Sequence, residues 1–69
     1  MGDVQKRVGG NVAKLRKQCG LTQEALAHAA DVKQTYLSEI ENGKRNPTLG
    51  MLVRLATALS ADVHDLTRP

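Results

Sequence analysis

Apolar residues recur along this chain at the spacing of one helix face, and this periodicity limits its folds more than any other feature. The first periodic segment carries Val8, Val12, Leu15 and Cys19. Four more periodic segments follow, separated by turn-forming residues at Cys19-Gly20, Asp31, Asn42-Gly43, Asn46-Pro47 and Ser60. No window alternates apolar and polar residues as a surface strand does. The sequence therefore predicts an all-α fold of five helices.

Capping residues predict the ends of the second and third helices. Thr22 offers an N-cap oxygen to a short second helix that ends by Asp31. A third helix is predicted over residues 34–41, and Gly43 supplies the left-handed residue that commonly follows a helix. Both helices are short, so they must be stabilised mainly by packing.

The last third of the chain predicts two more helices. Thr48 caps a helix whose apolar stripe runs from Leu49 to Leu59, and we expect that stripe to be buried. Asp62, with Asp65 three residues later, resembles a capping box for a last short helix. The far end of the stripe and the final helix, about residues 57–69, form a candidate dimer seam.

The chain is small, with 69 residues that leave room for one domain, predicted over residues 1–69. It has no Trp or Phe, and Tyr36 is its one aromatic residue, so the core must be aliphatic. Cys19 is the single cysteine and cannot close an internal disulfide; we expect it to be a small apolar core residue. No apolar run is long enough to span a membrane, and a cytoplasmic location is expected.

Positive charge is concentrated in the first two thirds of the chain. Ten Lys and Arg against seven Asp and Glu give a net charge of +3. Residues 1–45 hold eight of those basic residues and five of the acidic ones, whereas residues 46–69 are balanced. This distribution favours a polyanionic partner, although surface lysines can also serve solubility alone.

The joint between the second and third predicted helices has the geometry of a helix-turn-helix, at about residues 22–42. Only three residues separate the two helices, so they must cross at a steep angle. With Leu37 and Ile40 pointing inward, the opposite face of the third helix is polar. That face carries Gln34, Thr35, Ser38, Glu39 and Asn42. Side chains of these types can pair with base edges in a major groove, whereas a merely solvated face more often carries Lys, Glu and Arg.

Two stretches of the chain resemble the phage-repressor and Cro-like helix-turn-helix family, often called XRE. They are LTQEALA at residues 21–27 and YLSEIENGKRNPTL at residues 36–49. The similarity extends from about Val8 to Leu66. It implies a compact five-helix, lambda-repressor-like domain whose second and third helices bind DNA. It also implies transcriptional regulation, with two copies bound as a dimer to a near-palindromic operator.

The resemblance further implies three groups of site residues. The base-reading positions are Gln34, Thr35, Ser38 and Glu39. The phosphate-contacting positions are Gln23, Lys33, Tyr36, Asn42, Lys44 and Arg45, although Tyr36 lies on a flank where it can equally pack. Arg16 and Glu41 stand where related domains join the first helix to the third by an ion pair.

Three features depart from the family pattern. Lys33 replaces the Ser or Thr that usually caps the recognition helix, and an ammonium cannot accept a hydrogen bond. Asp31 and Ser60 each stand where glycine is common after a helix. Gly9-Gly10 is expected to loosen the amino end, because glycine weakens a helix interior.

No catalytic site, metal or cofactor is expected. His28, His64 and Cys19 have no recognised zinc-ligand spacing. Glu39 and Glu41 face different sides of one helix, so they cannot act as a catalytic pair.

The sequence thus predicts a non-enzymatic regulator of prokaryotic or phage origin that associates with the nucleoid. Double-stranded DNA and a second copy of the chain are the expected partners. A small stand-alone repressor or a restriction–modification controller fits best. An antitoxin of a toxin–antitoxin pair and a helical module that binds only protein stay open, with RNA polymerase or a toxin as further candidate partners.

Overall fold

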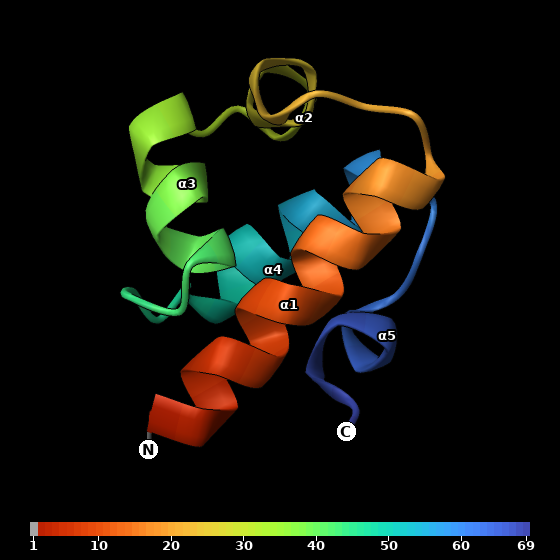
Figure 1. Ribbon diagram of the computed structural model, residues 1–69. Coiled ribbons are helices and arrows are strands. Elements are labelled where there is room, and N and C mark those ends of the chain that lie inside the picture. Colours follow the sequence, from red (N-terminus) through yellow and green to blue (C-terminus); the bar gives the residue numbers. More distant parts are fainter. Residues whose placement is uncertain (1) are drawn as a thin grey trace.

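Helices make up most of the computed structural model, which describes residues 2–69 (Figure 1). They are α1 (Gly2–Gln18), α2 (Gln23–Ala30), α3 (Gln34–Glu41), α4 (Leu49–Ala58) and α5 (Val63–Thr67). The described residues contain no strand, so the predicted all-α fold of five helices is confirmed. Residue 1 of the predicted domain lies outside the described residues. No helix among residues 2–69 combines the length and the apolar character needed to cross a membrane.

Side-chain caps begin three of the helices at the predicted residues. Thr22 Oγ1 accepts from the Ala25 N–H at 3.0 Å at the start of α2. Thr48 Oγ1 accepts from the Met51 N–H at 3.1 Å at the start of α4. Each cap satisfies one of the backbone N–H groups that an α-helix leaves without a partner.

The predicted capping box of α5 is present in both directions. The Asp65 N–H donates to the Asp62 side chain at 2.9 Å, and the Asp62 N–H donates to the Asp65 side chain at 3.1 Å. The two reciprocal bonds satisfy two N–H groups at once. A helix of only five residues therefore has a well-defined start.

Left-handed residues end several helices. Asp31 after α2 has φ 56°, and Ser60 after α4 has φ 55°, so both positions adopt the left-handed backbone that glycine tolerates best. Gly43 after α3 has φ 72°, as predicted for a helix stop. Lys33 has extended backbone at the start of α3, and its side chain makes no capping hydrogen bond.

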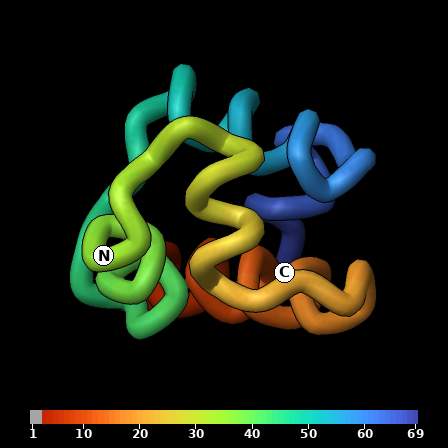
Figure 2. The backbone as a smooth tube through the Cα atoms, turned by 90° about the horizontal axis from the view of Figure 1, so that it is seen from above, coloured from red at the N-terminus to blue at the C-terminus, as the bar shows by residue number. Residues whose placement is uncertain are grey.

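The core is aliphatic, as predicted, and all five helices contribute to it. Its buried members are Val8, Val12, Leu26, Ala27, Ala30, Leu37, Ile40, Leu55, Ala56, Leu59 and Leu66. Helix α1 packs against α3 on one side and α5 on the other, while α4 packs against α2 and α5 (Figure 1). Figure 2 shows α2 and α3 side by side, joined by the short turn at residues 31–33.

Cys19 is exposed, so the prediction that it belongs to the core is wrong. Helix α1 ends at Gln18, and Gly20 turns the chain with φ 73°, which takes residue 19 off the inner face of the helix. The Cys19 Sγ donates to the Leu59 carbonyl oxygen at 3.7 Å, in a partly buried contact.

The apolar stripe of α4 is only partly buried, which also corrects the prediction. Leu55 and Leu59 lie in the core, but Leu49 is 69% exposed and Val53 is 47% exposed. Leu49 is the first residue of α4 and Val53 lies one turn later on the same side. Helix α4 packs against α2 and α5, and these helices leave Leu49 and Val53 uncovered.

Gly9 has a packing role that the sequence did not predict, because it allows a close approach between α1 and α3. A Cβ at this position would overlap the Ile40 carbonyl oxygen and lie 3.1 Å from carbonyl atoms of Glu41. The missing side chain therefore lets the end of α3 pack directly on α1. Gly10, the next residue, faces open space where a Cβ would stand, and so it has no such packing role.

Candidate nucleic-acid interface

The turn between α2 and α3 holds the two helices at a defined angle. Asp31 supplies the left-handed residue, and the Val32 N–H donates to the Ala27 carbonyl at 2.9 Å. Lys33 is extended, so the chain re-enters a helix at Gln34 in a new direction. Leu37 and Ile40 then bury one side of α3 in the core. These contacts form the helix-turn-helix that the sequence predicts.

The four predicted base-reading residues lie together on α3. Gln34 and Thr35 are exposed, and Ser38 and Glu39 are partly exposed. All four lie outside the set of residues that form the core. The structure therefore presents a short polar ridge along α3, which begins next to the turn from α2.

Glu39 makes a contact that the sequence did not predict. Its Oε1 accepts from Arg45 Nε at 2.7 Å, and the Arg45 guanidinium lies 4.6 Å from the centre of the Tyr36 ring. The hydrogen bond to Glu39 raises the pKa of Arg45 from its ordinary value. Both charged side chains are close to half exposed. A predicted base reader and two predicted phosphate contacts thus form one cluster.

The other predicted phosphate contacts flank α3. Lys33 precedes the helix and Lys44 follows it, both are exposed, and neither forms an ion pair within residues 2–69. Asn42 is the C-cap residue of α3, and its Nδ2 donates to the Ser38 carbonyl at 2.9 Å. Two unpaired lysines therefore stand at opposite ends of the polar ridge.

Arg16 and Glu41 form the ion pair that the resemblance implies, largely buried at 12% and 5% side-chain exposure. Gln23, predicted to contact a phosphate, also donates its Nε2 to Glu41 Oε1 at 3.0 Å. Arg16 Nη1 donates to the Leu21 carbonyl at 2.9 Å. No local pattern signals the Gln23 contact, because the two residues are 18 positions apart. The network ties α1, the start of α2 and the end of α3 together.

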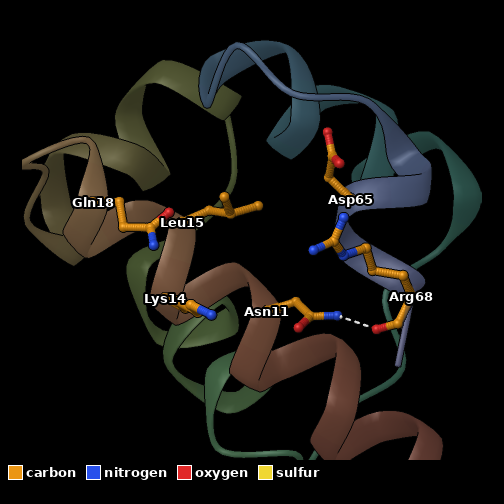
Figure 3. Close-up of a pocket in the computed structure, with 6 residues that line it drawn as sticks. All are labelled: Asn11, Lys14, Leu15, Gln18, Asp65 and Arg68. Carbon is orange, nitrogen blue, oxygen red and sulfur yellow. Dashed lines mark hydrogen bonds between the residues drawn. The ribbon is translucent and has the colours of Figure 1, made fainter.

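A polar depression lies on another part of the surface, between α1 and α5. It is lined by Asn11, Lys14, Leu15, Gln18, Asp65 and Arg68 (Figure 3). Asn11 Nδ2 donates to the carbonyls of Leu66 and Arg68, at 3.0 and 2.8 Å, and so holds the end of the chain against α1. Residues 2–69 contain no cluster of three or more His, Cys, Asp or Glu placed to hold a metal ion.

Comparison with known proteins agrees with this geometry. The family model described as Helix-turn-helix, HTH_3, matches residues 12–66. The uncharacterized HTH-type transcriptional regulator y4dJ of Sinorhizobium fredii is 45% identical over 67 residues, which cover 97% of this chain and 87% of that protein. The control protein C.MunI of a Mycoplasma species is 40% identical over 67 residues, which cover 96% of this chain and 90% of that protein.

A solved structure shows the same arrangement of helices. The restriction–modification controller protein C.AhdI of Aeromonas hydrophila matches with a TM-score of 0.87 at 34% identity, covering 90% of this chain and 94% of that one. The family match spans the α2–α3 unit, the Arg16–Glu41 ion pair and the final helix. The chain belongs to the HTH_3 helix-turn-helix family, the XRE-type family that its sequence resembles.

Proposed function

We propose that this protein is a sequence-specific DNA-binding regulator of transcription that inserts α3 into the major groove. The observation that carries the proposal is the polar ridge of Gln34, Thr35, Ser38 and Glu39 on a helix whose other side is anchored by Leu37 and Ile40. Gln can pair with adenine, and the Thr methyl can lie against thymine. A helix held rigidly by its buried side can convert such contacts into sequence preference.

The charges around α3 support binding to the phosphate backbone. Lys33 and Lys44 stand at the two ends of the ridge without an acidic partner among residues 2–69. Lysines placed in this way can neutralise phosphates on both sides of a groove and release counterions. Such contacts set register and affinity, while the ridge sets sequence preference.

A two-fold dimer would place two α3 helices about 34 Å apart, one turn of DNA, on a near-palindromic operator. The seam predicted at residues 57–69 has little large apolar surface of its own, because Leu59 and Leu66 are buried in the core. Thr57 is exposed and follows Leu49 and Val53 at four-residue intervals on α4. The proposed dimer surface therefore extends from the seam back along α4.

The relatives support a role as a small control protein that acts by binding, without catalysis. One relative is named a control protein, and a structural relative is a restriction–modification controller. A role of this kind would place the protein on prokaryotic or phage DNA in the cytoplasm. Contact with RNA polymerase, or with a toxin, would be a separate property that DNA binding does not require.

Selection of bound duplexes from a random pool, followed by fluorescence titration of the selected duplex, tests the proposal. We expect an enriched sequence with two-fold symmetry. Affinity should fall by about tenfold or more between about 50 and 200 mM salt, as two or more neutralised phosphates require. The absence of binding to any duplex at the lower salt concentration would contradict the proposal and favour a module that binds only protein.

A further inference from the structure

Two arginines of this protein use their guanidinium groups in different ways. Arg16 donates from Nε and Nη2 to Glu41 and from Nη1 to Leu21, so every nitrogen of its guanidinium is engaged. Arg45 donates from Nε to Glu39, and Tyr36 is the only other side chain among residues 2–69 that contacts its guanidinium. The outer edge of the Arg45 guanidinium is therefore available to a ligand.

Two contacts restrict where that free edge can point. Glu39 Oε1 holds Nε at 2.7 Å, and the Tyr36 ring lies 4.6 Å from the guanidinium carbon. Tyr36 is itself partly buried against the hydrophobic core, so its ring has a fixed place on α3. A long arginine side chain normally loses much rotamer freedom when it binds, and prior restraint reduces that loss.

We propose, building on the proposed function, that Arg45 reads a guanine and that Glu39 is a positioning residue for Arg45 and does not itself read a base. The guanidinium is planar and carries parallel N–H donors, which match the O6 and N7 acceptors of guanine in the major groove. The proposal reverses the roles that the resemblance implies, in which Glu39 reads a base and Arg45 contacts a phosphate. It leaves Gln34, Thr35 and Ser38 as the base readers of the polar ridge.

Electrostatics favours this assignment over a direct base contact by Glu39. A free carboxylate close to the DNA backbone would repel phosphates, whereas the Glu39–Arg45 pair carries no net charge. Arg45 already occupies Oε1 of Glu39, so a cytosine contact would be left to Oε2 alone. An orienting carboxylate keeps that bond and adds the contact between Arg45 and guanine.

The proposal is tested by selecting bound duplexes and measuring their affinities for three proteins: the wild type, Arg45→Lys and Glu39→Ala. Lysine keeps the charge but lacks the planar pair of donors. We expect the wild type to prefer guanine at one position of each half-site, and both variants to lose about tenfold of that preference at the same position. Replacing that guanine by 7-deazaguanine, which lacks the N7 acceptor, should weaken the wild type about tenfold and affect either variant less than about threefold.

Lys14→Ala is the matched control for these variants. Lys14 lines the depression between α1 and α5 (Figure 3). Helices α3 and α5 lie on opposite sides of α1 (Figure 1). The Lys14→Ala variant should retain both the preference for guanine and the loss of affinity on replacement by 7-deazaguanine. Thermal melting of each variant shows whether it is folded, which we expect because Glu39 and Arg45 are close to half exposed.

Two results would overturn the inference while leaving the proposed function intact. One is an Arg45→Lys protein that keeps its guanine preference, as a phosphate contact would allow. The other is a Glu39→Ala protein that stays fully sensitive to 7-deazaguanine, because Glu39 would then not position Arg45. A wild type that binds no duplex would overturn the proposed function and this inference with it.

Discussion

Arg16 and Glu41 join α1 to the end of α3 through two parallel hydrogen bonds, Nε to Oε2 at 2.7 Å and Nη2 to Oε1 at 3.0 Å. The two residues are 25 positions apart and largely buried. Gln23 brings the start of α2 to the same carboxylate. The network therefore sets the orientation of both helices of the helix-turn-helix with respect to α1.

Removing one member of this pair should strongly destabilise the protein. Glu41→Ala leaves the buried Arg16 charge without its partner, and we expect the free energy of unfolding to fall by about 3 kcal/mol or more. Chemical denaturation measures this change. The double variant Arg16→Met/Glu41→Leu removes both charges and should recover most of the loss. A small loss in the single variant would show that water already compensates the charge.

Arg16 should contribute little to the pH dependence of stability around neutral pH. The hydrogen bond to Glu41 raises the pKa of Arg16 in the folded protein. The stability that Arg16 contributes is therefore fully present below its pKa in the unfolded chain, and is lost only as the pH rises past its pKa in the folded protein. Both values lie far above neutrality.

The two adjacent glycines of α1 should respond in opposite directions to alanine. Gly9→Ala forces a Cβ into the Ile40 carbonyl, and we expect a loss of about 2 kcal/mol or more in the free energy of unfolding. Gly10→Ala meets open space on an exposed helix surface and should gain about 1 kcal/mol. Chemical denaturation of both variants measures the two changes. Equal effects from the two substitutions would contradict the close approach of α3 to α1 at Gly9.

The left-handed turn after α4 offers a second matched pair. Ser60 has φ 55°, which disfavours any side chain, so Ser60→Gly should raise the free energy of unfolding by about 0.5–1 kcal/mol. Gly20 has φ 73° with open space around it, so Gly20→Ser should lower it by about 1 kcal/mol. Thermal melting of both variants, under one buffer condition, checks the two signs.

The apolar stripe of α4 should divide into core and surface positions. Leu55 is fully buried, and Leu55→Ala should cost about 3 kcal/mol of the free energy of unfolding. Leu49 is 69% exposed, and Leu49→Ala should change it by less than about 0.5 kcal/mol at low protein concentration. If α4 forms the proposed dimer surface, Leu49→Ala should also weaken self-association in sedimentation experiments.

Substitutions at base-contacting and phosphate-contacting residues should have different effects on affinity across a panel of duplexes. Gln34→Ala should reduce the preference for the selected sequence, because Gln34 is an exposed member of the polar ridge. Lys44→Ala should weaken binding to all sequences alike. The plot of log affinity against log salt concentration should also become less steep, by about the amount that one phosphate contact contributes. Lys14→Ala controls for the lost charge. An unchanged preference after Gln34→Ala would remove this residue from the proposed base readers.

Local patterns are sufficient to predict most of the secondary structure. Thr22, Thr48 and the Asp62–Asp65 box act on neighbouring backbone groups, so their spacing predicts where three helices begin. The same holds for Gly43, whose left-handed backbone is the one expected after α3. The polar ridge on α3 also follows from periodicity, because Leu37 and Ile40 identify the buried side.

Contacts between distant segments cannot be inferred in this way. Periodicity places Cys19 and Leu49 inside, but the end of α1 and the limited surface opposite α4 leave them exposed. Propensity likewise marks Gly9 as a weak point, although α3 passes directly over it. Helical spacing indicates which side of a helix is apolar, but whether that side is buried depends on which part of it the other helices cover. Glu39 and Arg45 are only six positions apart, but their contact depends on the path of the chain after α3, which the turn at Gly43 does not fix by itself.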